Sequence, residues 1–324
     1  MTKKIIMGMG NAVLDVIFSC DQKTLDSLGL TKGQMTIVDQ KKSFDTTKNL
    51  TPVMKSSGGS VANTISGIGI LGGKASFCGR VCNDSLGKDF IRDIIKNNVD
   101  HLCTPSSEGP PTAKCSVFVT QDGERTMQTF LGASVMLDEK DIKEQYFKNT
   151  SILFIEGYLW SSESARGAIK KAIFFAKKYN TLVVFSLSDS GLTKMFKNDF
   201  KLFIKNNVDL LIGNENEFKA LVELDDLKEI AKEISLLVDR AVMTSGGGGA
   251  YFIFQSDIKN FKAHINNNII DSTGAGDMFA AGFLYKLNLA EDIGSCIDFG
   301  CLIASKILSY YGARPTKEIF NLSD

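Results

Sequence analysis

The chain has 324 residues, of which 44% are apolar and 23% are charged, and its 37 basic residues balance its 37 acidic ones. This composition is ordinary for a globular protein, and the length allows one large α/β domain or two smaller ones. A net charge near zero offers no basic surface to nucleic acid or to an anionic membrane, so we expect a small-molecule partner. No apolar run is long enough to cross a bilayer, and we expect a cytoplasmic protein.

The seven cysteines are scattered through apolar segments without a Cys-x-x-Cys pair, and the chain has two histidines. An odd number of scattered cysteines predicts reduced, buried thiols. With so few histidines we expect no structural metal site.

The first third of the chain predicts short strands before any regular alternation begins. Three β-prone runs, at 5–9, 13–18 and 35–38, could form a small sheet or the edge of a larger one. The elements that follow are predicted to be a helix at 61–71, a strand at 75–81, a helix at 86–97 and strands at 115–120 and 126–131. An Asp-Gly pair separates the last two strands, which indicates a β-hairpin.

Strands and helices alternate regularly from residue 152 onward. The predicted strands are 152–155, 181–186, 210–213, 241–244 and 251–254. The predicted helices are 163–178, about 194–206, 215–223 and 227–237, with two more closing the chain. This alternation favours a mostly parallel sheet between two layers of helices, an α/β/α sandwich. We expect one domain over 1–324, with a small β lid contributed roughly by 11–40 and 113–132.

The most informative motif is Asp-Ser-Thr-Gly-Ala-Gly-Asp at 271–277, which runs directly into an apolar stretch typical of a buried helix. The free N–H groups and positive dipole end of such a helix bind anions, and small side chains let a phosphoryl group approach the main chain. Asp277 would repel that group unless it takes a proton from an attacking hydroxyl. The alternative is that Asp277 only complements the helix dipole.

A second glycine cluster, at 57–60, opens the helix that carries Asn63. Paired glycines allow a ligand to approach the backbone, and Asn63 can bond a hydroxyl. The alternative is a simple turn in which Ser60 is the N-cap. Asp15 lies in an apolar strand-like run, and if its carboxylate faces inward it needs hydrogen-bond donors, such as two neighbouring sugar hydroxyls.

Two further segments follow predicted strands. Four glycines at 246–249 could form a wall for nucleotide phosphates or a flexible connection. Asn214 to Glu217 starts a helix, where acids commonly complement the dipole unless a metal is near. A bound triphosphate would bring Mg²⁺, which keeps most of its waters and needs few carboxylates.

Taken together, these motifs resemble the two signatures of the ribokinase/PfkB family of small-molecule kinases, and the resemblance covers nearly the whole chain. The first signature is Gly58-Gly59-Ser60 to Asn63, continuing through 79–87, and the second is 271–277. The resemblance implies a ribokinase-like fold, ATP and Mg²⁺ as cofactors, and K⁺ as a further cofactor in part of the family. It implies ATP and a nucleoside or sugar as partners, and a monomer or homodimer.

The resemblance also implies roles for the candidate residues. Asp277 would be the general base, beside an anion hole formed by Gly274, Ala275 and Gly276. Mg²⁺ would be held, through water, by Asn214 and Glu217. The residues expected on the nucleotide side are Asn214, Thr244, Gly246, Gly249 and Thr273. The residues expected on the substrate side are Asn11, Asp15, Gly58, Gly59, Asn63 and Arg125.

Within the family the chain is most similar to adenosine kinases, through 8–15 and through 123–134, where Arg125 is expected to steady the phosphates. Two departures are Ala12, where those kinases often have proline, and Cys301, where asparagine is common in the family. The candidates to stack on a purine are Met35, Met127, Phe130 and Leu159, with core packing as the alternative for each.

These observations leave three hypotheses for function. The first is ATP-dependent phosphorylation of a primary hydroxyl on a ribose-containing nucleoside, with adenosine to AMP as the first choice. The second keeps the chemistry but takes a free sugar such as ribose or fructose. The third is a nucleotide-binding protein without turnover, against which an intact Asp277 argues, because a pure binder would gain by losing a carboxylate beside phosphate.

Overall fold

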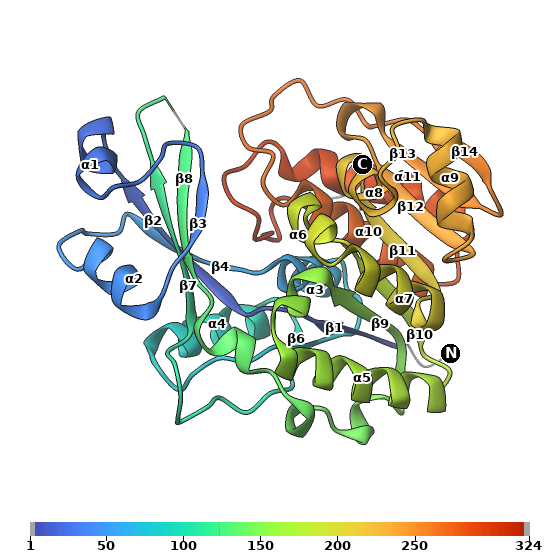
Figure 1. Cartoon of the computed structure of the whole chain (residues 1–324), viewed down its shortest axis with the longest axis horizontal. Coiled ribbons are helices and arrows are strands. Elements are labelled where there is room, and N and C mark those ends of the chain that lie inside the picture. Colours follow the sequence, from blue (N-terminus) through green and yellow to red (C-terminus); the bar gives the residue numbers. More distant parts are fainter. Residues whose placement is uncertain (1–3, 123, 321–324) are drawn as a thin grey trace.

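The computed structural model describes residues 4–122 and 124–320, which form a large sheet between two helical layers and a smaller sheet at one side (Figure 1). The large sheet has, in spatial order, the strands β14 (Asp257–Phe261), β13 (Ala250–Phe254), β12 (Arg240–Thr244), β11 (Leu210–Asn214), β10 (Leu182–Ser186), β9 (Thr150–Glu156), β1 (Ile5–Met9), β5 (Ala75–Cys78) and β6 (Val99–His101). Neighbouring strands from β12 to β6 pair in parallel, whereas β13 is antiparallel to both of its neighbours.

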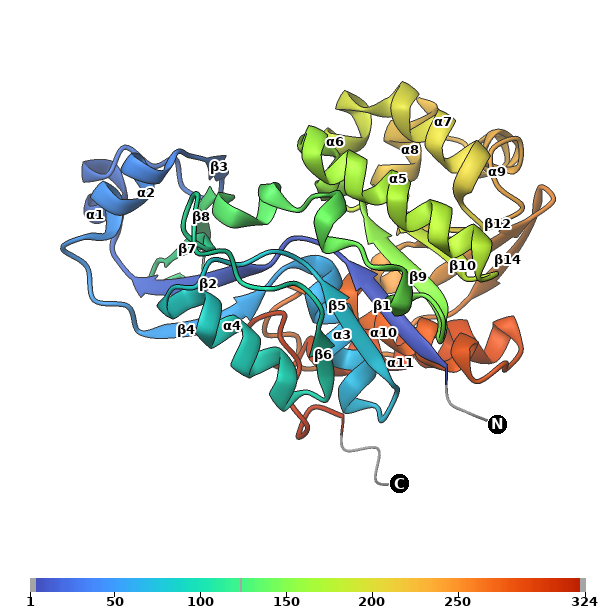
Figure 2. The same cartoon turned by 90° about the horizontal axis from the view of Figure 1, so that it is seen from below.

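Helices cover both faces of this sheet, as the alternation predicts (Figure 2). One layer contains α5 (Glu163–Lys178), α6 (Ser190–Met195), α7 (Lys197–Asn207), α8 (Glu215–Val222) and α9 (Leu227–Ser235). The other contains α3 (Ser60–Ile70), α4 (Ser85–Lys96), α10 (Ala275–Asn288) and α11 (Ile293–Ile307). Short 3₁₀ turns complete the connections: η1 (Gly132–Met136), η2 (Glu139–Asp141), η3 (Glu144–Tyr146), η4 (Gly157–Ser161) and η5 (Gly246–Gly248).

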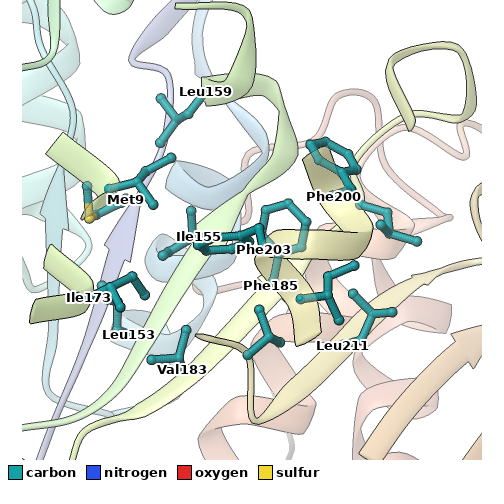
Figure 3. Packing of buried hydrophobic residues seen from close by; sticks show 14 of the residues in the cluster. Met9, Leu153, Ile155, Leu159, Ile173, Val183, Phe185, Phe200, Phe203 and Leu211 are labelled. Carbon is teal, nitrogen blue, oxygen red and sulfur yellow. The ribbon is translucent and has the colours of Figure 1, made fainter. Parts of the chain in front are cut away.

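The core is divided by the sheet into two clusters, which explains why the parallel strands are apolar on both sides. Figure 3 shows part of the cluster beneath α5 and α7, where Leu153, Val183 and Leu211 of neighbouring strands meet Ile173 and Phe203. The opposite cluster lies beneath α3, α4, α10 and α11. Burial of this much apolar surface on both faces fixes the strand ends, where the loops of the site begin.

Local signals place α5 where the sequence predicts it. Ser162 caps its start by accepting a hydrogen bond from the N–H of Ala165, and Lys177 and Lys178 lie at the negative end of the helix dipole. The helix predicted at about 194–206 is α7, and an additional short helix, α6, precedes it and meets it at Phe196.

The smaller sheet is the predicted lid and has the strand order β3 (Met35–Ile37), β8 (Arg125–Phe130), β7 (Ala113–Val119), β2 (Val13–Ser19) and β4 (Met54–Gly58). β7 and β8 form the predicted antiparallel hairpin, whose Gly123 lies outside the described residues. The sheet also includes β4, which the predicted lid segments leave out. Residues of α1 (Gln22–Ser27) and α2 (Gln40–Thr47), two helices that the sequence analysis missed, pack against one face of it.

Other differences concern the N-terminal strand and the cysteines. β1 is neither part of the lid nor an edge strand, because it pairs with both β9 and β5 inside the large sheet.

All seven cysteines are free, as expected, but Cys20 and Cys82 are only half-buried. In the described part of the chain, no helix is both long and apolar enough to span a membrane.

The hairpin between β12 and β13 depends on Gly249, whose φ of 88° and ψ of −130° are open only to glycine. A Cβ atom there would lie 2.0 Å from the carbonyl oxygen of Phe261, whereas one on Gly247 would enter open space. We predict that Gly249→Ala lowers the free energy of unfolding by at least about 2 kcal/mol in urea titrations, and that Gly247→Ala changes it by less than about 0.5 kcal/mol. Equal losses in both variants would contradict this reading of the turn.

Candidate active site

The glycine loop at 271–277 opens α10, as predicted. Gly274 is the N-cap, with φ of 80°, and no side chain caps the helix. A Cβ atom on Gly274 would approach Ala313 to 2.6 Å, so glycine is required, while one on Gly276 would meet nothing within 4 Å. The N–H of Ala275 donates to the Ser272 carbonyl at 3.2 Å. The N–H of Ala275 is thus already engaged, whereas the space beside Gly276 is open, which suits an approaching anion.

Asp277 is held from both sides by α3. The hydroxyl of Ser60 donates to Oδ1 of Asp277 at 2.6 Å, and Nδ2 of Asn63 donates to Oδ2 at 2.9 Å. Thr64 adds a hydrogen bond to the Asp277 carbonyl at 3.1 Å. Burial raises the pKa of Asp277 to about 6, and the two side-chain hydrogen bonds limit that rise. The carboxylate is thus ionised at neutral pH, and its pKa is close enough to 7 for it to accept a proton.

The same contacts correct one expectation about α3. Its N-cap is Gly59, with φ of 92°, and not Ser60, whose hydroxyl is committed to Asp277. Asn63 is 3% exposed, and its Oδ1 has no hydrogen-bond partner. A buried acceptor without a partner is costly, so Oδ1 is suited to receive a ligand hydroxyl.

The substrate-side residues gather where the lid meets the large sheet. The carboxylate of Asp15 lies directly against Gly58, because a Cβ atom there would be 3.0 Å from both carboxylate oxygens. Gly59 approaches Asn11 so closely that its Cβ would lie 2.1 Å from the Asn11 carbonyl oxygen. Burial raises the pKa of Asp15 to about 6, while Arg314 and Arg125 oppose the rise.

A carboxylate that the sequence analysis missed ties these segments together. Glu156 ends β9 and is fully buried; its Oε1 accepts the N–H of Asn11 at 2.7 Å and its Oε2 accepts the N–H of Val61 at 2.9 Å. Burial raises the pKa of Glu156 to about 7. The signal available in the sequence was an acid followed by glycine at the end of an apolar strand, whereas Asp15 was singled out as an acid inside an apolar run.

The lid reaches the glycine loop through Arg125. Its guanidinium pairs with Asp271 and donates to Oγ1 of Thr273 at 3.0 Å. Thr273 also donates to Asp271 at 2.6 Å, and Asp271 accepts the N–H of Gly312. Arg125 therefore faces the site from β8 and connects the smaller sheet to the glycine loop. Thr273, predicted on the nucleotide side, is part of this connection.

The nucleotide-side residues border a cavity of about 600 Å³ beside the start of α10. Its lining includes Asn214, Thr244, Gly246, Gly249, Gly276 and Cys301. A smaller cavity, of about 90 Å³, is lined by Asp277 and Ser60 as well as by Asn214, Thr244 and Gly276. Asp277 consequently lies between the large cavity and the substrate-side residues.

Asn214 and Glu217 form a capping box at the start of α8. They therefore have the structural role at a helix start that the sequence analysis gave as the alternative to metal binding. Oδ1 of Asn214 accepts the N–H of Glu217 at 3.0 Å, and Glu217 accepts from the backbone and side chain of Asn214. Burial raises the pKa of Glu217 to about 7. Among residues 4–122 and 124–320, no group of three or more acidic, histidine or cysteine side chains could hold a metal ion.

The apolar residues considered for base stacking fall into two groups. Leu159 is 1% exposed within the large core, and Phe130 borders a groove beside α2 with Phe44. Core packing is therefore the role of Leu159. Met35 is 52% exposed, and Met127 pairs with it across β3 and β8, two residues from Arg125 on the same face of the lid.

Comparison with known proteins identifies the family and the fold. A family model described as pfkB family carbohydrate kinase matches residues 22–319. An adenosine kinase from Sinorhizobium meliloti is 31% identical with a TM-score of 0.89, covering 97% of this chain and 96% of that one. A probable sugar kinase from Rhizobium etli CFN 42 is 32% identical with a TM-score of 0.90, covering 98% and 97%.

A 5-dehydro-2-deoxygluconokinase from Geobacillus kaustophilus (strain HTA426) is 28% identical over 281 residues, which are 80% of this chain and 82% of that protein. The fold is the expected ribokinase-like α/β fold, with a mostly parallel large sheet. The chain is a phosphotransferase with an alcohol group as acceptor, and it belongs to the pfkB family of carbohydrate kinases.

Proposed function

We propose that this kinase transfers the γ-phosphoryl group of ATP to the 5′-hydroxyl of adenosine. The observation that carries the proposal is the position of Asp277, which is buried, hydrogen-bonded to Ser60 and Asn63, and next to the open start of α10. A hydroxyl held beside Asn63 would give its proton to Asp277 as its oxygen bonds to phosphorus and the bond to the β-phosphate oxygen breaks. The N–H groups at the start of α10 would stabilise the charge on the transferred group.

The face of the smaller sheet that carries Asp15, Met127 and Arg125, called the lid face below, supports a nucleoside as acceptor. Register places Ile17, Val117 and Met127 in one row across β2, β7 and β8, and the neighbouring row holds Asp15. This face also carries Arg125, which points at the glycine loop. A ribose needs the hydrogen bonds of Asp15 and Asn63, but it does not need an apolar surface of this breadth, whereas a purine does.

A free sugar is the second candidate, because a carboxylate and an unpartnered amide oxygen suit any compact polyol. Two proteins similar to this chain are named as a sugar kinase and a 5-dehydro-2-deoxygluconokinase. Glu217 suits a hydrated Mg²⁺ in either case, and the metal would neutralise phosphate charge when bound.

The acceptor is identified by measuring ADP release with adenosine, guanosine, inosine, ribose and fructose in the presence of MgATP. We expect the highest kcat/KM with adenosine. Activity confined to free sugars would overturn the nucleoside assignment, and ADP release no greater than that without acceptor would favour a binding protein without turnover.

The role of Asp277 predicts both a mutational and a pH effect. Asp277→Asn keeps the size and planar shape of the side chain but cannot take a proton, so we expect kcat to fall by about 10²- to 10⁴-fold with little change in ATP binding. Since the pKa of Asp277 is raised to about 6 and the base must be ionised, wild-type kcat/KM should fall as pH decreases through about 6. A flat profile between pH 5 and 8, or unchanged turnover in the variant, would remove Asp277 as the base.

The lid face predicts a change confined to the acceptor. Met127→Glu places a charge where we expect the base to stack, so KM for adenosine should rise about tenfold or more while KM for ATP changes less than about twofold. The matched control is Met195→Glu, at a methionine of α6 that is 75% exposed. If both variants keep the wild-type KM for adenosine, the base does not stack on this face.

A further inference from the structure

Arg314, in the segment after α11, makes an unusual set of contacts with a part of the chain about 250 residues away. Its Nε donates to the Ser57 carbonyl at 3.0 Å, its Nη1 to the Ala62 carbonyl at 2.9 Å and its Nη2 to the Gly58 carbonyl at 3.2 Å. Nη1 also contacts the hydroxyl of Ser66. One side chain thus binds the end of β4 and the first turns of α3.

These acceptors belong to the segment 57–66, which connects β4 to α3 and is called the substrate-side corner below. Gly58, whose carbonyl Arg314 binds, has the carboxylate of Asp15 against its other side. Ala62 lies between Ser60 and Asn63, the two residues that hold Asp277. Glu156 fixes the same corner from the sheet side through Val61 and Asn11. The start of α3 is therefore held by Arg314 on one side and by the Glu156 carboxyl group on the other, and both residues are distant from α3 in the sequence.

The chemistry of the contacts explains why an arginine stands here. A guanidinium is a planar group with five N–H donors in a fixed geometry, so it can serve three carbonyls and a hydroxyl at once. The carbon at its centre lies 5.8 Å from the centre of the Phe90 ring, which supports the plane of the group. A lysine keeps the charge but has one nitrogen, which cannot reach all four acceptors together.

We propose, on the basis of the kinase function inferred above, that Arg314 is a positioning residue that sets the Gly58-Gly59 corner and the start of α3 for the acceptor. It does so without touching the reacting atoms. Loss of its contacts would let Gly58 shift against Asp15 and let Asn63 shift against Asp277, so the acceptor would be held less firmly while the ATP side of the site is unaffected.

The charge of Arg314 adds a second effect that geometry alone would not produce. Asp277 is faced by Arg314, by the neutral donors Ser60 and Asn63 of α3, and by Glu156, Glu217 and Tyr158. Arg314 lowers the pKa of Asp277 and also that of Asp15, while Asp277 raises the pKa of Glu156 and Glu217. Burial lowers the pKa of Arg314 to about 10, so it remains a cation at neutral pH. Removing this cation would raise the pKa of the base.

Two variants separate the contacts from the charge. Arg314→Lys keeps the charge and loses the multiple contacts, and Arg314→Gln loses both. We expect both to raise KM for adenosine about tenfold or more, with KM for ATP within about twofold of wild type. Only Arg314→Gln should move the acid limb of the pH profile, upward by roughly half a pH unit or more. The control is Arg166→Gln, at an arginine of α5 that pairs with Asp199.

Wild-type KM for adenosine in both variants would overturn the proposal. So would a parallel loss of ATP affinity, or equal shifts of the acid limb in both variants, since a merely structural role predicts these. If Arg314→Gln does not fold, as judged by circular dichroism, the KM of Arg314→Lys for adenosine tests the proposal alone. If the wild-type protein turns over no acceptor, the proposed function fails separately, and adenosine binding by calorimetry to wild type and Arg314→Lys still tests the positioning role.

Discussion

The site depends on one constraint, the burial of the Asp277 carboxylate next to the open start of α10, where we propose that the transferred phosphoryl group binds. Taking a carboxylate out of water is costly unless donors satisfy it, and here α3 supplies both, through Ser60 and Asn63. The two helix starts must therefore keep a fixed distance from each other. Much of the surrounding structure serves that requirement, including the Glu156 contacts on the sheet side and the Arg314 contacts on the other.

The sheet topology explains why this meeting point lies where it does. β1 pairs with β9 on one side and β5 on the other, and the chain proceeds outward from it in both directions. Such a reversal opens a crevice at the carboxyl ends of the strands, where ligands bind in open α/β sheets. Asn11 follows β1 and Glu156 ends β9, so their hydrogen bond lies at this crevice. The lid strand β2 begins directly beyond it, which brings Asp15 to the same place.

The sequence predicted what short-range patterns encode. Alternating periodicity gave the α/β fold and the bounds of α5, and the glycine loop of 271–277 gave the start of α10. Features set by contacts distant in the chain were missed. β4 is a polar segment that becomes a strand only because β2 lies beside it. The run at 5–9 could belong to a small sheet or to the edge of a larger one, and only its pairing with β9 and β5 places it inside the large sheet. Arg314 follows Ala313 in a short segment without a recognisable pattern, and its acceptors lie about 250 residues earlier.

The most direct test of the central claim is the identity of the phosphorylated product, observed by proton-coupled ³¹P NMR after incubation with MgATP and adenosine. Transfer to a primary hydroxyl under the control of Asp277 predicts a new monoester signal split into a triplet by two neighbouring protons, growing in step with ADP. A doublet would mean transfer to a secondary hydroxyl, and inorganic phosphate alone would mean hydrolysis of ATP. Either result would contradict the account of how Asp277 and the substrate corner hold the acceptor.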